Sequence, residues 1–149
     1  MTPLRSVLAV LAGAIVVIFV RSVLEQTLVG ALADTPQLDQ DGYLAIRNRP
    51  AVLTATLVAY GLAATLAGYI LARIAGAREI PHALAAAAVL IAAYAFAFTS
   101  DNPMLPPVWA RAVILVVTPP ALAAGAAVRA QVRALRAEQA GSARSEERS

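Results

Sequence analysis

Four long apolar stretches, separated by short polar segments, constrain this chain more than any other feature of its sequence. They cover about residues 4–33, 50–74, 81–99 and 107–128. A helix needs about 20 mostly apolar residues to cross the hydrocarbon core of a bilayer, so each stretch is long enough to span a membrane. Because lipid offers no hydrogen-bond partner to an exposed backbone, each spanning segment has to be helical. The sequence therefore predicts an all-α membrane protein with one transmembrane domain over residues 1–128.

Composition favours lipid over water as the solvent of this chain. Its residues are 60% hydrophobic and only 14% charged, with a mean hydropathy of +0.71, whereas about a quarter of a soluble domain is charged. The chain has no cysteine, which excludes disulfides, thiolate metal sites and thiol catalysis. The single histidine, His82, cannot form a multi-histidine metal or haem site alone. We therefore expect no metal and no cofactor.

Proline and glycine mark the ends of the apolar stretches. Pro50, Pro81 and Pro107 open three of them, and proline suits the first helical position because its missing N–H would be unpaired there anyway. Gly76 separates the second stretch from the third, and a proline-rich turn over residues 101–107 separates the third from the fourth. Such short connections predict an antiparallel bundle of four neighbouring transmembrane helices.

The arginine distribution predicts the orientation in the membrane. All twelve basic residues are arginine, and cytoplasmic loops carry the excess of basic residues in membrane proteins. One side of the predicted bundle carries Arg5, Arg73, Arg78, Arg129, Arg133, Arg136, Arg144 and Arg148, whereas the other carries Arg47, Arg49 and Arg111. We therefore expect a multi-pass protein of a bacterial inner membrane with both termini in the cytoplasm.

The residues after the fourth stretch predict a short amphipathic helical extension over 129–141. Arg129, Arg133 and Arg136 recur at helical spacing, with Val128, Val132 and Leu135 on another face. Such a segment either lies along anionic lipid headgroups or prolongs the helix into water. The pI near 10 comes with an excess charge of only +3 beside membrane segments, which favours anionic headgroups over nucleic acid as the partner. We expect Gly141 to cap the extension and residues 142–149 to form a disordered tail.

A group of polar residues falls inside or near the predicted membrane segments. Arg21 and Glu25 are four residues apart and share a helix face. Arg111, Tyr60 and Tyr94 reach a similar depth, so the five side chains have the depth needed to form one cluster. Ionisable residues within a membrane often carry function, which would make Glu25 a protonatable site or a ligand anchor. The alternative is a structural ion pair that orients the first helix.

Small residues and prolines predict how the helices pack. Ala64 with Gly68, and Ala121 with Gly125, form small-x-x-x-small pairs that let helix backbones approach closely. The spacing fits packing within the chain or against a partner. Pro119 and Pro120 lie in the middle of the fourth stretch and predict a kink, which would be either a gating hinge or a static bend.

Three short segments resemble a family of small four-helix bacterial inner-membrane proteins that carries no assigned activity. They are Gly42-Tyr43-Leu44, the run from Leu66 to Gly76 (LAGYILARIAG), and Pro81-His82-Ala83-Leu84. The resemblance implies the fold and the bacterial inner membrane. It implies no activity for this chain.

The sequence lacks a catalytic constellation, which decides the ranking of the functional hypotheses. It contains no Ser/His/Asp set, no glycine-rich phosphate loop and no metal-ligand spacing. We therefore expect a non-enzymatic protein that associates through its helices, as an accessory subunit of a membrane complex or as a homo-oligomer. The alternative is a small proton-coupled transporter or channel that uses Glu25, by analogy with the four-helix small multidrug transporters. A lipid-handling enzyme is a third possibility.

Overall fold

The computed structural model describes residues 3–33, 39–76, 78–100, 102 and 105–146, with side chains described from residue 6 to residue 142. All regular structure in these ranges is helical: α1 (Pro3–Ala31), α2 (Gln40–Arg47), α3 (Pro50–Ala75), α4 (Glu79–Phe98) and α5 (Val108–Glu146). The helices α1, α3, α4 and α5 are long and apolar enough to cross a membrane. The prediction of an all-α chain with four such helices is therefore confirmed.

The ends of α3 and α4 show how the sequence sets the helix boundaries. Pro50 opens α3, and Gly76 ends it in a left-handed conformation (φ 73°) with its N–H bonded to the Ala72 carbonyl at 3.0 Å. By contrast, α4 begins at Glu79 and not at Pro81. The first four N–H groups of a helix have no partner within it, so proline is tolerated at the third position as well as at the first. The predicted start of this helix was therefore two residues late.

The short helix α2 lies in the polar segment between the first two apolar stretches, where no helix was predicted. Asp39 caps it, because its Oδ1 accepts a hydrogen bond from the Gly42 N–H at 2.8 Å. Arg47 lies in its last turn, where a cation is favoured by the helix dipole. With eight residues, α2 is too short to span a membrane, and it packs across the ends of α1 and α3.

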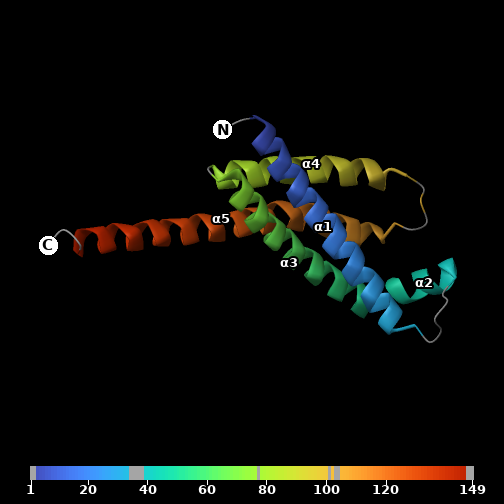
Figure 1. The fold of residues 1–149 in the computed structure, drawn as a ribbon. Helices are drawn as coiled ribbons and strands as arrows, with labels where there is room; N and C mark the ends of the chain where they lie inside the picture. Colours follow the sequence, from blue (N-terminus) through green and yellow to red (C-terminus); the bar gives the residue numbers. More distant parts are fainter. Residues whose placement is uncertain (1–2, 34–38, 77, 101, 103–104, 147–149) are drawn as a thin grey trace.

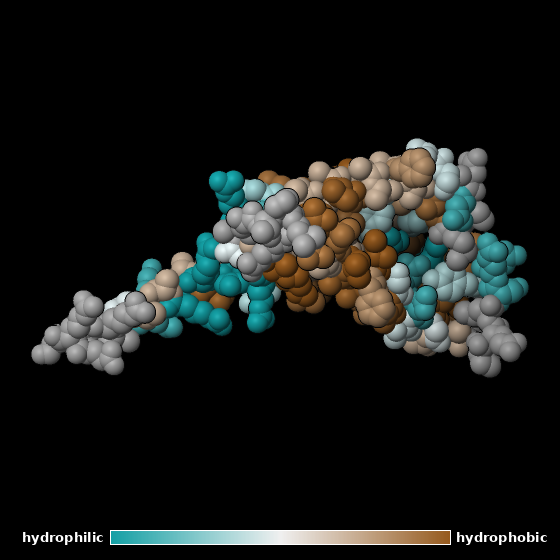
Figure 2. All heavy atoms as spheres, turned by 45° about the horizontal axis from the view of Figure 1, so that its top comes forward, coloured by the Kyte–Doolittle hydropathy of each residue, from teal (hydrophilic) through white to brown (hydrophobic). Residues whose placement is uncertain are grey.

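The four long helices are not equivalent in their packing. In Figure 1, α1 and α3 both cross α5, and the contacts that α3 makes with α5 and with α1 are the most extensive in the molecule. The helix α4 packs mainly on α5 and makes smaller contacts with α3 and α1. The core between these helices contains the fully buried side chains of Tyr60, Leu71, Ile114 and Leu122. Apolar side chains gather over the middle of the molecule, and hydrophilic ones gather at both ends (Figure 2).

The predicted small-residue pairs lie at the contact between α3 and α5. A Cβ atom added to Gly68 would overlap the backbone carbonyl of Leu122, and one added to Gly125 would overlap the carbonyl of Thr65. The two backbones are therefore in direct contact, which only glycine permits. Ala64 is fully buried in the same core and Ala121 is half-buried. Of the two expectations for these residues, packing within the chain is the one that the structure shows.

The helix α5 is longer than predicted and has no break after the membrane segment. It contains 39 residues and is about 58 Å long at ~1.5 Å per residue. It remains helical through Pro119 and Pro120, where the predicted kink stays a prediction. The predicted cap at Gly141 is wrong, because the helix continues through Gly141 to Glu146. The predicted disordered tail is therefore helical over 142–146, and residues 147–149 lie outside the described residues.

Candidate functional site

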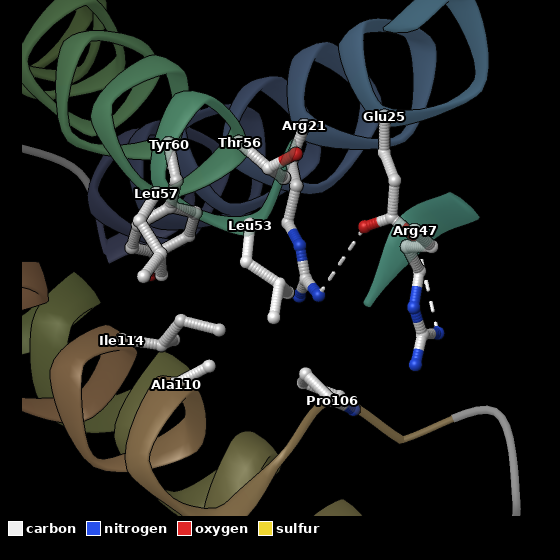
Figure 3. Close-up of a pocket in the computed structure, with 10 residues that line it drawn as sticks. All are labelled: Arg21, Glu25, Arg47, Leu53, Thr56, Leu57, Tyr60, Pro106, Ala110 and Ile114. Atoms are coloured by element: carbon white, nitrogen blue, oxygen red, sulfur yellow. Dashed lines mark ion pairs between the residues drawn. The ribbon is translucent and has the colours of Figure 1, made fainter. Parts of the chain in front are cut away.

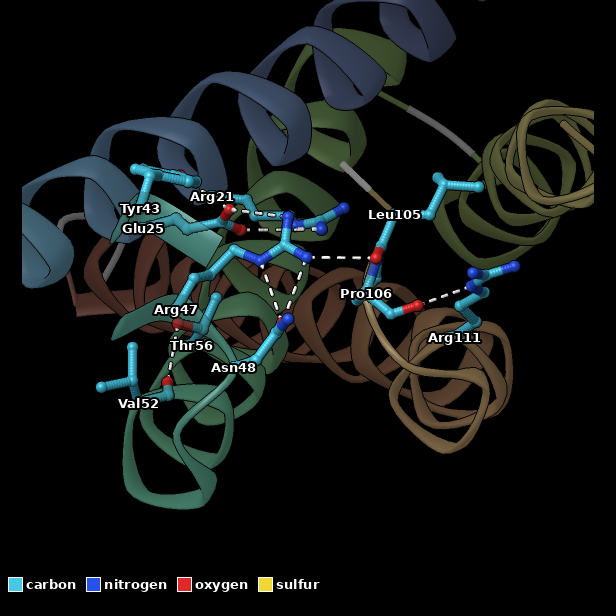
Figure 4. A network of polar contacts seen from close by, with 10 residues as sticks. All are labelled: Arg21, Glu25, Tyr43, Arg47, Asn48, Val52, Thr56, Leu105, Pro106 and Arg111. Carbon is cyan, nitrogen blue, oxygen red and sulfur yellow. Dashed lines mark hydrogen bonds and ion pairs between the residues drawn. The ribbon is translucent and has the colours of Figure 1, made fainter. Parts of the chain in front are cut away.

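The polar cluster predicted around Glu25 forms only in part, and it includes residues that the prediction missed. It lies at the end of the molecule where α1 ends and α2, α3 and α5 begin (Figure 4). Glu25 is on α1, one helical turn after Arg21, and the two side chains are 3.7 Å apart. Its other partners come from α2, which crosses the end of α1 and brings Tyr43 and Arg47 towards the carboxylate.

Three side chains contact the carboxylate of Glu25. The Tyr43 hydroxyl donates a hydrogen bond to Oε1 at 3.0 Å, and the guanidinium of Arg47 lies 4.0 Å from the same oxygen. Arg21 approaches Oε2. Because two guanidinium groups surround one carboxylate, this cluster carries an excess of positive charge. The side chain of Glu25 is 16% exposed, so the pairing is only partly screened by solvent.

Arg47 is the most buried member of the cluster and connects three parts of the chain. Its side chain is 5% exposed. Besides the contact with Glu25, it donates hydrogen bonds to the Asn48 side chain at 3.2 and 3.3 Å and to the Leu105 carbonyl at 3.1 Å. A buried cation is tolerated only when its donors are satisfied. Arg47 therefore ties α2 to α1 and to the segment that leads into α5.

A small cavity lies beneath the cluster. Arg21, Glu25 and Arg47 line its polar side, and Tyr60 lies on the side towards the core (Figure 3). Its volume is about 10 Å³, which corresponds to about one water molecule. A second hollow of about 230 Å³ lies against Glu25, Ser22, Gln26 and Tyr43. Arg21 and Glu25 thus line both the polar hollow and the small cavity.

Tyr60 and Tyr94 lie deeper in the bundle than the charged residues. The Tyr60 hydroxyl forms a hydrogen bond with the Thr118 hydroxyl, and both residues are buried. The ring of Tyr94 meets that of Tyr60 edge-on, with centroids 6.3 Å apart. The hydroxyl of Thr118 also contacts the Ile114 carbonyl at 2.6 Å, directly before the two prolines of α5. These tyrosines fix the α3–α5 and α3–α4 contacts and do not touch Glu25.

Arg111 does not join the cluster. Its Nε donates a hydrogen bond to the Pro106 carbonyl at 2.6 Å, and its Nη1 donates one to the Phe98 carbonyl at 3.3 Å. The guanidinium carbon also lies 5.8 Å from the centre of the Phe98 ring. Arg111 therefore connects the end of α4 to the start of α5. Among the described residues it makes no ion pair with Glu25.

The arginines predicted to meet lipid headgroups differ from one another. Arg133 binds within the protein, because its Nη1 is 2.8 Å from the Glu79 carboxylate and 2.9 Å from the Gly76 carbonyl. Its side chain is still 49% exposed. Arg136 is exposed and Arg129 is half-buried. Arg133 therefore has a structural role at the start of α4. Its predicted contact with lipid headgroups stays a prediction.

The described residues contain no group of three or more histidine, cysteine or acidic side chains that would hold a metal ion. Comparison of the chain with protein-family models, with curated proteins and with solved structures gives no match. The fold has four helices that are long and apolar enough to cross a membrane, which is consistent with a multi-pass membrane protein. The resemblance to small bacterial four-helix proteins stays a prediction.

Proposed function

We propose that this chain is a non-enzymatic membrane protein that works by association, as an accessory subunit of a larger membrane complex or as a homo-oligomer. In this proposal α1, α3, α4 and α5 cross a bacterial inner membrane as an antiparallel bundle. Both termini lie on the cytoplasmic side, because that side carries more arginine. The polar cluster around Glu25 then lies on the opposite side and holds α2 against the bundle.

The projecting part of α5 is the observation that carries this proposal. Beyond Arg133 the helix continues to Glu146, and residues 133–142 are all exposed. Figure 1 shows this part of α5 extending past every other helix. A helical segment of this length gains little stability in water without tertiary packing. A protein partner that covers its apolar face supplies that packing.

The face available to a partner is defined by helical spacing. Val128, Val132 and Leu135 lie on one side of α5, and Val128 and Leu135 are 48% and 59% exposed. Arg133 lies on a different side and is directed towards Glu79 at the start of α4. Leu135 on the apolar side of α5 therefore remains accessible, while Arg133 on the other side is paired with Glu79.

The packing residues also bear on the proposal. Gly68 and Gly125 are buried in the contact between α3 and α5, so these glycines are not accessible to a partner. The exposed part of α5 is therefore the surface that supports association.

Transport through Glu25 is the second candidate, and the hollow of about 230 Å³ beside that residue favours it. Against it, two arginines and a tyrosine contact the carboxylate, and the cavity behind it holds about one water. A transporter would lose proton-coupled flux in Glu25→Gln. Unchanged flux in that variant rules out the second candidate.

Site-specific photo-crosslinking tests association directly. A photoreactive residue replaces Leu135 on the apolar face, and Ala137 on the opposite face serves as the matched control. We expect a discrete crosslinked protein product from position 135 and much less from position 137. A product of twice the chain mass of 15.4 kDa indicates a homo-oligomer, and another mass indicates a foreign subunit. Equal labelling at both positions, or crosslinks to lipid alone, would contradict the proposal.

A further inference from the structure

A trough between α1 and α4 opens at the end of the molecule where both of these helices begin. Its volume is about 570 Å³, and its floor is apolar, with Val10 and Leu11 on α1 facing Val89 on α4. Ser6, Arg78 and His82 form its polar rim. In a chain that spans a membrane, this side of α1 and α4 faces lipid, so the trough has to be filled by an apolar group.

The rim of the trough is held in place by His82. The Nε2 atom of His82 is 3.0 Å from the Ser6 hydroxyl on α1, and Nδ1 is 2.9 Å from the Arg78 carbonyl. Because a carbonyl only accepts, Nδ1 donates the hydrogen bond to Arg78, and Nε2 forms the second hydrogen bond with the Ser6 hydroxyl. Both ring nitrogens are therefore engaged, and the histidine fixes the distance between the two walls at the rim.

Arg78 occupies a backbone conformation that does not suit arginine. Its φ and ψ are 52° and 48°, and it is the one described non-glycine residue with positive φ. This left-handed conformation is strained for a residue other than glycine. Glycine would adopt it without that strain, so the backbone gives no reason for arginine here. The exposed guanidinium at the rim is what arginine adds.

We propose that the trough binds an anionic phospholipid, with one acyl chain along Val10, Leu11 and Val89 and the headgroup phosphate at Arg78. The arrangement matches the ligand in both parts. A guanidinium pairs with a phosphate in a bidentate geometry, and the apolar floor begins directly beneath it. None of the residues that line the trough is acidic, so the charge that complements Arg78 comes from the ligand.

Native mass spectrometry of the full chain in mild detergent tests this site. Phosphatidylglycerol and phosphatidylcholine with identical acyl chains are titrated onto the protein. We expect a preference for phosphatidylglycerol that falls about fivefold in Arg78→Gly, because one arginine near anionic lipid contributes about 1 kcal/mol. Arg73→Gln is the matched control, since Arg73 is exposed at the same end of the molecule and does not line the trough. It should change the affinity less than twofold.

Arg78→Gly is also designed to keep the fold. Because glycine suits the left-handed conformation, the thermal midpoint of this variant without added lipid should equal or exceed that of the parent chain. The weaker binding of phosphatidylglycerol by this variant then cannot be attributed to unfolding. Equal affinity of the parent chain for the two lipids would overturn the proposal, as would equal losses in Arg78→Gly and Arg73→Gln.

A second pair of variants tests the acyl-chain part of the site. Ala85→Phe places a ring in the trough that Ala85 lines, whereas Ala88→Phe places the same ring on the exposed surface of α4 outside it. We expect Ala85→Phe to lower phosphatidylglycerol binding at least fivefold and Ala88→Phe to leave it unchanged. If Ala85→Phe instead dissociates a dimer and leaves lipid binding intact, the trough is a protein interface and the lipid proposal is wrong.

Discussion

The two ends of the molecule each hold one acidic residue against arginine, but the buried member of the pair differs. At the end near α2, Arg47 is buried (5% exposed) and Glu25 is the more accessible partner. At the end where α4 begins, Glu79 is buried (6% exposed) and Arg133 is half exposed. Glu25 has three partners, whereas Arg133 is the one ion-pair partner of Glu79 among the described residues. When one partner of a pair is removed, the loss of unfolding free energy should be larger if the charge that remains is buried.

The contact between α3 and α5 in the middle of the molecule connects its two ends. Substitution of Gly68 at this contact should give the largest loss of stability. Gly68→Ala forces a Cβ atom onto the Leu122 carbonyl, and backbone cannot move aside as a flexible side chain does. We expect a loss of about 3 kcal/mol in the free energy of unfolding. Thermal or denaturant unfolding in detergent measures it.

Gly61→Ala is the matched control for this prediction. Gly61 lies in the same helix, and a Cβ atom there meets only the Val117 side chain at 3.6 Å, an ordinary contact. We expect no loss, and a gain of up to about 1 kcal/mol from helix propensity. If both variants lose the same stability, α3 and α5 do not pack as described.

Arg133→Gln and Glu79→Gln test the asymmetry at the start of α4. Arg133→Gln leaves the buried carboxylate of Glu79 without its partner and should cost about 2 kcal/mol. Glu79→Gln leaves Arg133, whose exposed guanidinium turns to solvent, and should cost less than about 1 kcal/mol. Unfolding of the two variants under the same conditions gives both values. Equal costs would show that the burial of Glu79 does not control this pair.

Arg21→Gln tests the redundancy at the opposite end. Glu25 retains Arg47 and Tyr43 in this variant, so the loss of unfolding free energy should stay below about 1 kcal/mol. The same measurement as for Arg133→Gln allows a direct comparison. A cost above that of Arg133→Gln would reverse the expected order of the two ends.

Tyr43→Phe gives the smallest effect and a pH signature. Burial, then the charge of Glu25 and the hydrogen bond to it, raise the pKa of Tyr43 from 10.0 to about 12. The folded state therefore keeps its proton where the unfolded state loses it, so the stability present below pH 10 is lost as the pH rises towards 12. Unfolding midpoints measured from pH 9 to 12 should fall less steeply in Tyr43→Phe than in the parent chain. A slope in Tyr43→Phe identical to that of the parent chain would contradict the described hydrogen bond.

The four helices that are long and apolar enough to cross a membrane could be predicted from sequence because their signal is local. Apolar length and proline or glycine at the ends define α1, α3, α4 and α5 without knowledge of any neighbour. The helix α2 was missed because eight residues with mixed polarity give no such signal. The sequence does contain its cap, Asp39 three residues before Gly42, and this was the sign that could have found it.

The site was harder to predict because it depends on how the helices rotate about their axes. The i, i+4 spacing was enough to pair Arg21 with Glu25. It could not show that Tyr43 and Arg47, also four apart, turn towards the same carboxylate. Depth alone placed Arg111 near Glu25, but its position relative to Pro106 and Phe98 directs the guanidinium to their carbonyls.

The central claim of association is tested most directly by purifying the protein from its native membrane in mild detergent. The mass and composition of the purified particle are then measured. We predict either stoichiometric foreign subunits or a discrete multiple of the 15.4 kDa chain, and disruption of that particle by Leu135→Glu on the exposed face of α5. A clean monomer that Leu135→Glu leaves unchanged would contradict the account and make transport through Glu25 the leading explanation.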